Sequence, residues 1–94
     1  MKTLHISANK WFQASAGNTY HTIKIIIDGN TVYTSENMTY GYDTQYLTTA
    51  IDQLIDLGYL SKGYNDNISR WCRDRDIVFS DSVKTGLKRQ LFNF

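Results

Sequence analysis

Proline is absent from this 94-residue sequence, cysteine occurs once and histidine twice. The single thiol, Cys72, excludes a disulfide within the chain and is typical of a reducing compartment. With so few cysteines and histidines, the chain is also short of the usual ligands of a structural zinc site. We therefore expect no bound metal, and no cofactor is predicted either.

Long apolar runs and a strong net charge are missing as well. Residues 1–13 contain no apolar segment long enough for a signal peptide, and no later segment is long enough to span a membrane. The formal net charge is +1, so no strong field favours a nucleic acid or a membrane surface. Residues 61–94 hold seven Lys/Arg against four Asp/Glu, a mild basic excess that a solvated helix face explains. The expectation is a soluble cytoplasmic protein that binds no membrane, and binding of nucleic acid is disfavoured.

Common enzyme signatures are absent too. The sequence has no Gly-rich phosphate loop, no G-x-S-x-G elbow and no pair of metal ligands at helical spacing. Cys72 with His5 or His21 as its base remains an alternative, because such partners meet in space and not in sequence. A small buried thiol is the commoner role of a lone cysteine, and we expect that the protein is not an enzyme.

The N-terminal third predicts an antiparallel β-meander. Residues 2–12 alternate apolar and polar side chains, as a half-buried strand does. After a loop of small residues, residues 20–28 are rich in β-branched side chains and lead into Asp28-Gly29-Asn30, a strong hairpin-turn sequence. Residues 31–36 then form the return strand.

A helix is predicted over residues 43–58. Its apolar residues recur at i, i+3, i+4, i+7 and i+8 and form one stripe: Leu47, Ala50, Ile51, Leu54 and Ile55. Asp43 or Thr44 is a suitable N-cap, and Gly58 is a suitable left-handed C-cap.

The remaining third is less regular. Residues 68–75 are compatible with a short helical turn or with irregular structure, and residues 76–80 read as a short buried strand. A last helix is predicted from Asp81 or Ser82, because apolar residues repeat every four positions at Val83, Leu87 and Leu91. Residues 1–94 should thus form one α+β domain, with an antiparallel sheet of three to four strands (a β-meander) covered on one face by two helices.

Tyrosine is abundant, with seven of the thirteen aromatic residues, and such an excess is common at binding surfaces. Tyr40, Tyr42 and Tyr46 surround Gly41, which permits a positive φ or a close backbone approach just before a helix. Free N–H groups at that helix start suit an anion, and Trp11, if close to this helix start, would complete a pocket for a nucleotide-like ligand. Packing of the helix on the sheet would also use two of the three tyrosines.

A second concentration of polar side chains lies at the start of the second strand. Tyr20 and His21 follow Asn18 and Thr19, so four hydrogen-bonding side chains occur in succession. They are candidates for the same ligand pocket. The alternative is that Asn18 lies in the turn while its neighbours pair across strands.

The third candidate is the sequence ISRWCRDRD, in which three arginines flank a tryptophan: Arg70, Arg73 and Arg75 around Trp71. Guanidinium groups bind phosphate or carboxylate through two hydrogen bonds, and an indole offers a stacking face to a base. The alternative is that the arginines pair with Asp74 and Asp76, although exposed pairs of this kind are worth only about 0–1 kcal/mol.

The motifs KWF, GNTYHT, IIIDG and YGYDTQYLTTAIDQLIDLGY, between residues 10 and 59, resemble a group of small uncharacterised proteins from tailed bacteriophages. In many of those proteins a second glycine follows YGY, whereas Asp43 stands here. The resemblance covers about half the chain, and it implies a protein that acts in the host cytoplasm. Small phage proteins of this size are often inhibitors of bacterial immunity.

Two functions follow from that resemblance. In the first, the protein binds and sequesters a nucleotide-derived immune signal, such as a cyclic oligonucleotide or an ADP-ribose-type molecule, without catalysis. Ligand sites between protomers would then imply a homo-oligomer. In the second, the protein binds a host defence protein directly, as anti-CRISPR proteins do, through exposed tyrosines. We favour the first.

Overall fold

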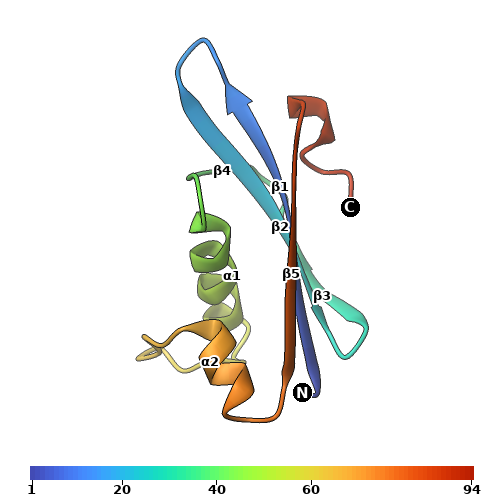
Figure 1. The fold of residues 1–94 in the computed structure, drawn as a ribbon, viewed down its shortest axis with the longest axis vertical. Helices are drawn as coiled ribbons and strands as arrows, with labels where there is room; N and C mark the ends of the chain where they lie inside the picture. Colours follow the sequence, from blue (N-terminus) through green and yellow to red (C-terminus); the bar gives the residue numbers. More distant parts are fainter.

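The computed structural model describes residues 1–94 as a twisted five-stranded sheet with two helices on one face (Figure 1). In chain order the elements are β1 (Thr3–Gln13), β2 (Asn18–Ile27), β3 (Asn30–Thr34), β4 (Thr39–Tyr40), α1 (Gln45–Asp56), α2 (Ile68–Arg73), β5 (Val78–Gly86) and the 3-10 helix η1 (Lys88–Gln90). The α+β class agrees with the prediction, whereas only α1 corresponds to one of the two predicted helices.

The predicted hairpins are confirmed. β1 pairs antiparallel with β2, and β2 pairs antiparallel with β3. Asp28 (φ 51°) and Gly29 (φ 79°) both have positive φ, as the two central residues of a type I′ turn require. The Asp28 carboxylate also accepts hydrogen bonds from the backbone N–H groups of Lys2 (2.6 Å) and Thr3 (2.9 Å), and these bonds lower its pKa. The turn therefore also holds the start of β1.

The expectation of a purely antiparallel sheet is wrong. The strand order is β3-β2-β1-β5, with β4 beside β2, and β5 runs parallel to β1. The chain leaves the sheet after β4, passes through α1 and α2 on one face, and returns to the edge beside β1 (Figure 1). A helical crossover of this kind brings the chain back in the direction of the strand it joins, and parallel pairing follows.

The predicted last helix is also wrong. Residues 78–86 form one strand that pairs with β1 from Thr3↔Val78 to Trp11↔Gly86. Pairing with the long β1 satisfies the backbone groups of this segment that face β1, which outweighs a weak helical repeat containing a glycine. The apolar repeat does not form a stripe, because Leu91 is buried while Val83 and Leu87 are exposed.

The central helix and its end are confirmed. α1 buries Tyr46, Ala50 and Leu54 against the sheet, and Gly58 has a φ of 86°. The N–H of Gly58 donates to the carbonyl of Ile55, and the N–H of Tyr59 donates to that of Leu54. These two bonds are those of a Schellman motif, which satisfies carbonyls at the helix end.

Residues 68–75, which the sequence left open, contain α2. Asn67 caps this short helix by accepting a hydrogen bond from the N–H of Arg70 (3.1 Å). No helix in the structure has the length and apolar character needed to cross a membrane.

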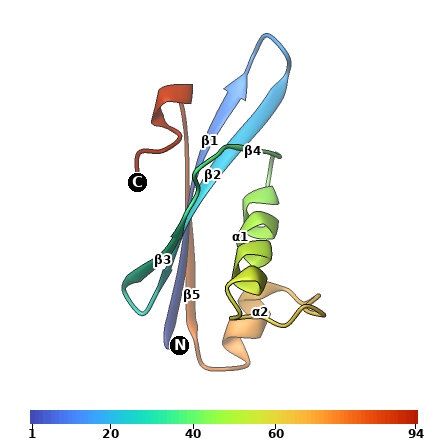
Figure 2. The ribbon, with the colours of Figure 1, turned by 180° about the vertical axis from the view of Figure 1, so that it is seen from behind.

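The two faces of the sheet differ. The helical face carries the core, in which α1 and α2 cover apolar side chains of the strands: Leu4, Ile6, Ala8, Ile23, Ile25 and Ile27. The opposite face, here called the open face, is crossed only by the C-terminal segment (Figures 1 and 2). The Asn9 side-chain amide binds that segment by donating to the carbonyls of Leu91 (3.1 Å) and Asn93 (3.0 Å). The Thr22 hydroxyl also donates to the Leu91 carbonyl.

Candidate functional site

Three of the predicted site residues form a row of aromatic rings across the open face. Trp11 pairs with Tyr20 across β1 and β2, and Tyr20 pairs with Tyr40 across β2 and β4. The rings of Trp11 and Tyr20 are stacked with centroids 5.7 Å apart, and Tyr40 meets Tyr20 edge-on at 5.8 Å. We call Trp11, Tyr20 and Tyr40 the aromatic row.

The two ends of the aromatic row differ in their exposure. Tyr40 is 59% exposed, while Trp11 and Tyr20 are half-buried. At the opposite end the Lys88 ammonium group lies over the Trp11 ring, 5.3 Å from its centroid. A cation held near an aromatic ring provides both the stacking surface and the positive charge that a phosphorylated base would need.

The open face carries positive charge and no carboxylate from the strands. The register places Lys24 opposite Ser7 and Lys84 opposite Asn9, so both lysines flank β1. Asp81 is the one acidic residue in the five strands, and it lies on the helical face, where it accepts a hydrogen bond from Tyr46. The C-terminal segment 87–94 adds Lys88 and Arg89 and no acidic side chain.

A polar groove lies between β1, β5 and the C-terminal segment, next to the aromatic row. Its larger part has a volume of about 440 Å³ and no hydrophobic lining residue: Asn9, Lys10, Lys84, Thr85, Gly86, Gln90 and Asn93. A smaller part of about 100 Å³ shares Asn9, Lys84 and Asn93 with it and adds Ser7, Lys24 and Ser82, together with Ala8 and Phe94. Gly86 pairs with Trp11, so the larger part begins where the aromatic row ends.

A cluster of hydroxyl groups around His5 was missed by the sequence analysis. The Nδ1 of His5 lies 2.7 Å from Ser80 Oγ, and its Nε2 lies 3.0 Å from Ser7 Oγ and 3.3 Å from Ser82 Oγ. The signal was the alternation of polar residues in β1 and in residues 80–82. It could be used only once residues 80–82 were known to lie in a strand beside β1.

His21 is not part of this surface. It is buried on the helical face, with Nδ1 3.2 Å from the carbonyl oxygen of Gly41 and Nε2 2.7 Å from Thr49 Oγ1. A neutral ring satisfies both contacts if Nδ1–H donates to Gly41 and Nε2 accepts from the Thr49 hydroxyl. Burial is the main cause of a lowered His21 pKa, so the ring is held in its neutral form.

The three tyrosines around Gly41 do not surround one pocket. Tyr40 lies on the open face and Tyr42 is exposed. Tyr46 points from α1 toward the sheet, where it is buried and its hydroxyl donates to Asp81 Oδ2 at 2.5 Å. The expected close approach at Gly41 is confirmed, because a Cβ there would lie 2.8 Å from Gln45 Cβ. At the start of α1, the position predicted to receive an anion, the Lys10 ammonium group donates to the carbonyl of Asp43.

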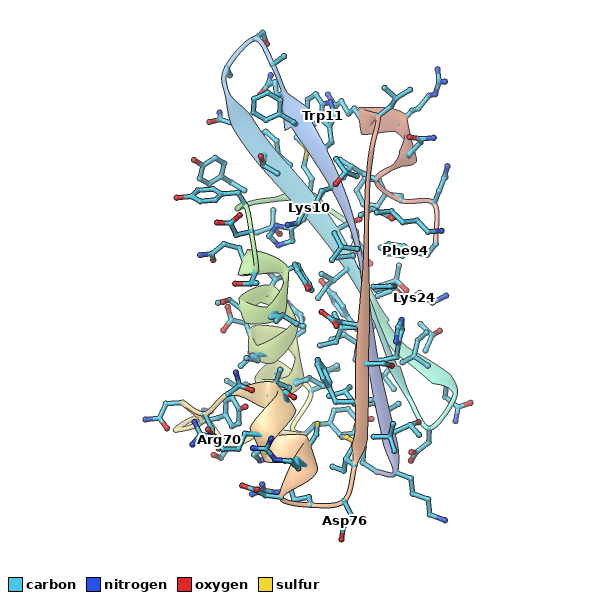
Figure 3. The ribbon with its side chains drawn as sticks, in the orientation of Figure 1. Lys10, Trp11, Lys24, Arg70, Asp76 and Phe94 are labelled. Carbon is cyan, nitrogen blue, oxygen red and sulfur yellow. The ribbon has the colours of Figure 1, made fainter.

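The arginine and tryptophan cluster lies at the other end of the molecule (Figure 3). Trp71 packs edge-on against Tyr64, and the Arg75 guanidinium lies 4.3 Å from the centre of its ring. Arg70 pairs with Asp66 at 3.3 Å and not with Asp74 or Asp76, the partners named in the alternative interpretation.

Arg73 is exposed and enters no ion pair. Figure 3 places Trp11 and Arg70 near opposite ends of a molecule whose longest extent is 43 Å. One small ligand therefore cannot contact both clusters.

Cys72 is fully buried in α2, and burial raises the pKa of its thiol. A raised pKa keeps the thiol protonated, and a protonated thiol is a poor nucleophile. The geometry thus favours the buried structural role over the nucleophilic one.

The open face is therefore the surface best suited to bind a ligand. The aromatic row, the unpaired lysines Lys24 and Lys84 and the polar groove lie next to one another there. Comparisons of the chain with protein-family models, with curated protein sequences and with solved structures found no match.

Proposed function

We propose that the protein binds a nucleotide-derived ligand on its open face and holds it without changing it chemically. The observation that carries the proposal is the aromatic row of Trp11, Tyr20 and Tyr40 beside a polar groove that contains Lys84 and no carboxylate. Aromatic side chains on a sheet surface stack bases, and neighbouring cations hold the phosphates.

The two parts of this surface match the two parts of a nucleotide. A base can stack on the exposed Tyr40 ring, or on the Trp11 face where Lys88 now lies. The sugar and phosphate then extend into the polar groove, whose larger part is lined by three amide side chains, one hydroxyl and two lysines, Lys10 and Lys84. Unlike a hydrophobic pocket, such a lining can form hydrogen bonds with a ligand that is polar along its whole length.

The biological role that we propose is counter-defence. The sequence resembles small proteins of tailed bacteriophages, and sequestration of a nucleotide immune signal needs binding but no catalytic group. Under this proposal the protein acts in the host cytoplasm as a homo-oligomer that lowers the free concentration of the signal.

A second candidate is an inhibitor that binds a host defence protein. The supporting observation is a set of exposed aromatic residues near the end of the β1–β2 hairpin: Phe12 at 54%, Tyr40 at 59% and Tyr42 at 58% exposure. Exposed aromatic residues are frequent hot spots in protein interfaces. This function predicts a stable complex with a host protein and no small-molecule ligand.

Native mass spectrometry of the protein with a panel of cyclic and linear nucleotides separates the two candidates. A ligand-dependent mass shift is expected, and Tyr40→Ala should weaken binding of that nucleotide by about 5- to 100-fold, the loss typical of one base–aromatic stack. Arg73→Ala is the matched control, because Arg73 lies in the α2 cluster at the opposite end and should leave binding unchanged. The proposal would be contradicted if no nucleotide produced a mass shift, or if only Arg73→Ala lost binding.

A further inference from the structure

We infer that the smaller part of the polar groove is a phosphate-binding pocket, and that the ligand is a short oligonucleotide instead of a mononucleotide. The ligand length rests on the proposed function, because it assumes a base at the aromatic row. The phosphate pocket itself rests only on the residues that line it.

Two lysines face this pocket from both sides of β1. Lys24 comes from β2 and Lys84 from β5, and both line the cavity of about 100 Å³. Neither forms a salt bridge, since the ion pairs of the structure involve only the N-terminus with Asp28 and Arg70 with Asp66. The positive charge of both lysines is therefore not balanced by any carboxylate side chain, and a bound phosphate would balance it.

Hydroxyl groups complete the pocket. Ser7 and Ser82 line it, and the Ser82 hydroxyl donates to Ser7 Oγ at 3.4 Å. The His5 ring contacts both hydroxyls through Nε2 and therefore fixes their positions at the edge of the cavity. His5 is in this sense a positioning residue. Asn9 already donates to the C-terminal segment, so its amide shapes the pocket without serving as a phosphate donor.

The distance to the aromatic row sets the length of the ligand. Trp11 and Ser7 lie on the same face of β1, four residues apart, which corresponds to about 13 Å at roughly 3.3 Å per residue. Nucleotides in a stacked strand repeat about every 3.4 Å, so a stacked ligand would need about four nucleotides and a more extended one fewer. A ligand with a base on the aromatic row and a phosphate at Lys24 and Lys84 is thus longer than a nucleoside monophosphate.

The test is a set of four titrations, with pyrophosphate, adenosine, AMP and a tetranucleotide, followed by ¹H–¹⁵N NMR on the full chain. Pyrophosphate should shift the backbone amide signals of Ser7, Lys24 and Ser82, whereas adenosine should shift the indole N–H signal of Trp11. Linear tetra-adenylate carrying a 5′-phosphate should shift both sets and bind at least tenfold more tightly than AMP.

Lys84→Gln should weaken pyrophosphate binding by about tenfold or more, the loss expected for one charged contact. Lys62→Gln, in the loop between α1 and α2, is the control of equal charge change and should have no effect. A His5→Gln variant keeps both lysines and should weaken pyrophosphate binding less than Lys84→Gln does, which separates positioning from direct contact.

The outcomes distinguish the two proposals. If adenosine shifts the Trp11 signal but pyrophosphate shifts no amide signal, the phosphate pocket is overturned and the aromatic site is retained. Pyrophosphate shifts at Ser7 and Ser82 without any response of Trp11 to adenosine would overturn the proposed nucleotide function while keeping the anion pocket. AMP that binds as tightly as the tetranucleotide would overturn the inferred ligand length.

Discussion

Tyr46 and Tyr64 lie on the same side of the sheet, and they differ in what their hydroxyl groups contact. The Tyr46 hydroxyl donates to Asp81 at 2.5 Å, whereas the buried Tyr64 hydroxyl has no hydrogen-bond partner. A hydrogen bond to a charged group contributes about 1.5–3 kcal/mol, while an unsatisfied buried hydroxyl costs about 1–3 kcal/mol. The same chemical change should therefore have opposite effects at the two positions.

We expect Tyr46→Phe to lower the free energy of unfolding by about 1–2 kcal/mol, and Tyr64→Phe to leave it unchanged or to raise it. Urea unfolding at neutral pH followed by circular dichroism measures both. Tyr46→Phe should also change how stability depends on pH. Desolvation by burial is the larger cause and the hydrogen bond to Asp81 the next, and together they raise the Tyr46 pKa from 10.0 to about 12. Between these values the unfolded chain loses this proton first, so stability should fall from pH 10 to 12 in the wild type and fall less in Tyr46→Phe.

His21 predicts a second dependence on pH, in the acidic range. Burial lowers its pKa below the ordinary value of 6.5, so the unfolded state binds a proton at a higher pH than the folded state does. Its contribution to stability is complete above about pH 6.5 and is lost as the pH falls through the lower folded-state pKa.

Chemical unfolding measured from pH 8 to pH 5 should show this loss in the wild type. His21→Gln should remove that part of the pH dependence, and His5→Gln, on the open face, should retain it. Equal curves for the wild type and His21→Gln would contradict the buried neutral ring.

At the scale of elements, the end of α1 was predictable because it depends on residues close together in the sequence. Gly58 has a φ of 86°, and a side chain there would meet open space, so the cost of a substitution comes from the backbone conformation alone. An L-residue in the left-handed region costs roughly 1–2 kcal/mol relative to glycine.

We therefore expect Gly58→Ala to lower the free energy of unfolding by about 1 kcal/mol, measured by thermal or urea unfolding. Gly63→Ala is the matched control. Gly63 also has open space around it but lacks a positive φ, so alanine there should be neutral or slightly stabilising. Equal losses at both positions would argue against the Schellman motif as the cause.

The strand β5 shows where local patterns fail. Its sequence VFSDSVKTG contains a four-residue apolar spacing that continues to Leu91, and this spacing predicts a helix. Side chains four positions apart also share one face of a strand, as Phe79 and Val83 do here, so the spacing fits a strand equally well when a partner is present. β1 supplies that partner over nine pairs, but nothing near β5 in the sequence indicates it.

On the scale of the whole molecule, β5 is an edge strand with one unpaired side. All nine residues pair with β1 without a recorded register shift, and eight of the nine side chains are exposed. The other edge is shorter and interrupted, since β3 has five residues and a register shift occurs at Ile25/Ile26. A long regular edge is the usual place for a second chain to add.

We expect two copies to pair antiparallel through β5 about a two-fold axis near Val83. This register places Val83 beside its copy and Ser82 beside Lys84, whereas an axis at Asp81 would bring two carboxylates together. Analytical ultracentrifugation should show a dimer for the wild type and a monomer for Val83→Lys. Thr34→Lys, on the β3 edge, should remain dimeric. A monomeric wild type, or a dimer that persists in Val83→Lys, would contradict this pairing.

The features that the sequence alone determined depend on neighbouring residues: the Asp28-Gly29 turn, the apolar stripe of α1, the left-handed Gly58 and the choice of β-strands for the first third. Turn conformation and helix periodicity are set by local sterics and by side chains a few positions apart, so they can be recognised without knowing the fold.

Only the tertiary structure decided how distant segments align. The parallel pairing of β5, the aromatic row and the His5 cluster all follow from register, which joins residues as far apart as His5 and Ser80. The candidate site residues lie in three places: on the open face, in the core and near α2. Those on strands are separated because successive side chains of a strand point to opposite faces of the sheet. Which face is covered depends on where the helices pack, and no short stretch of sequence contains that information.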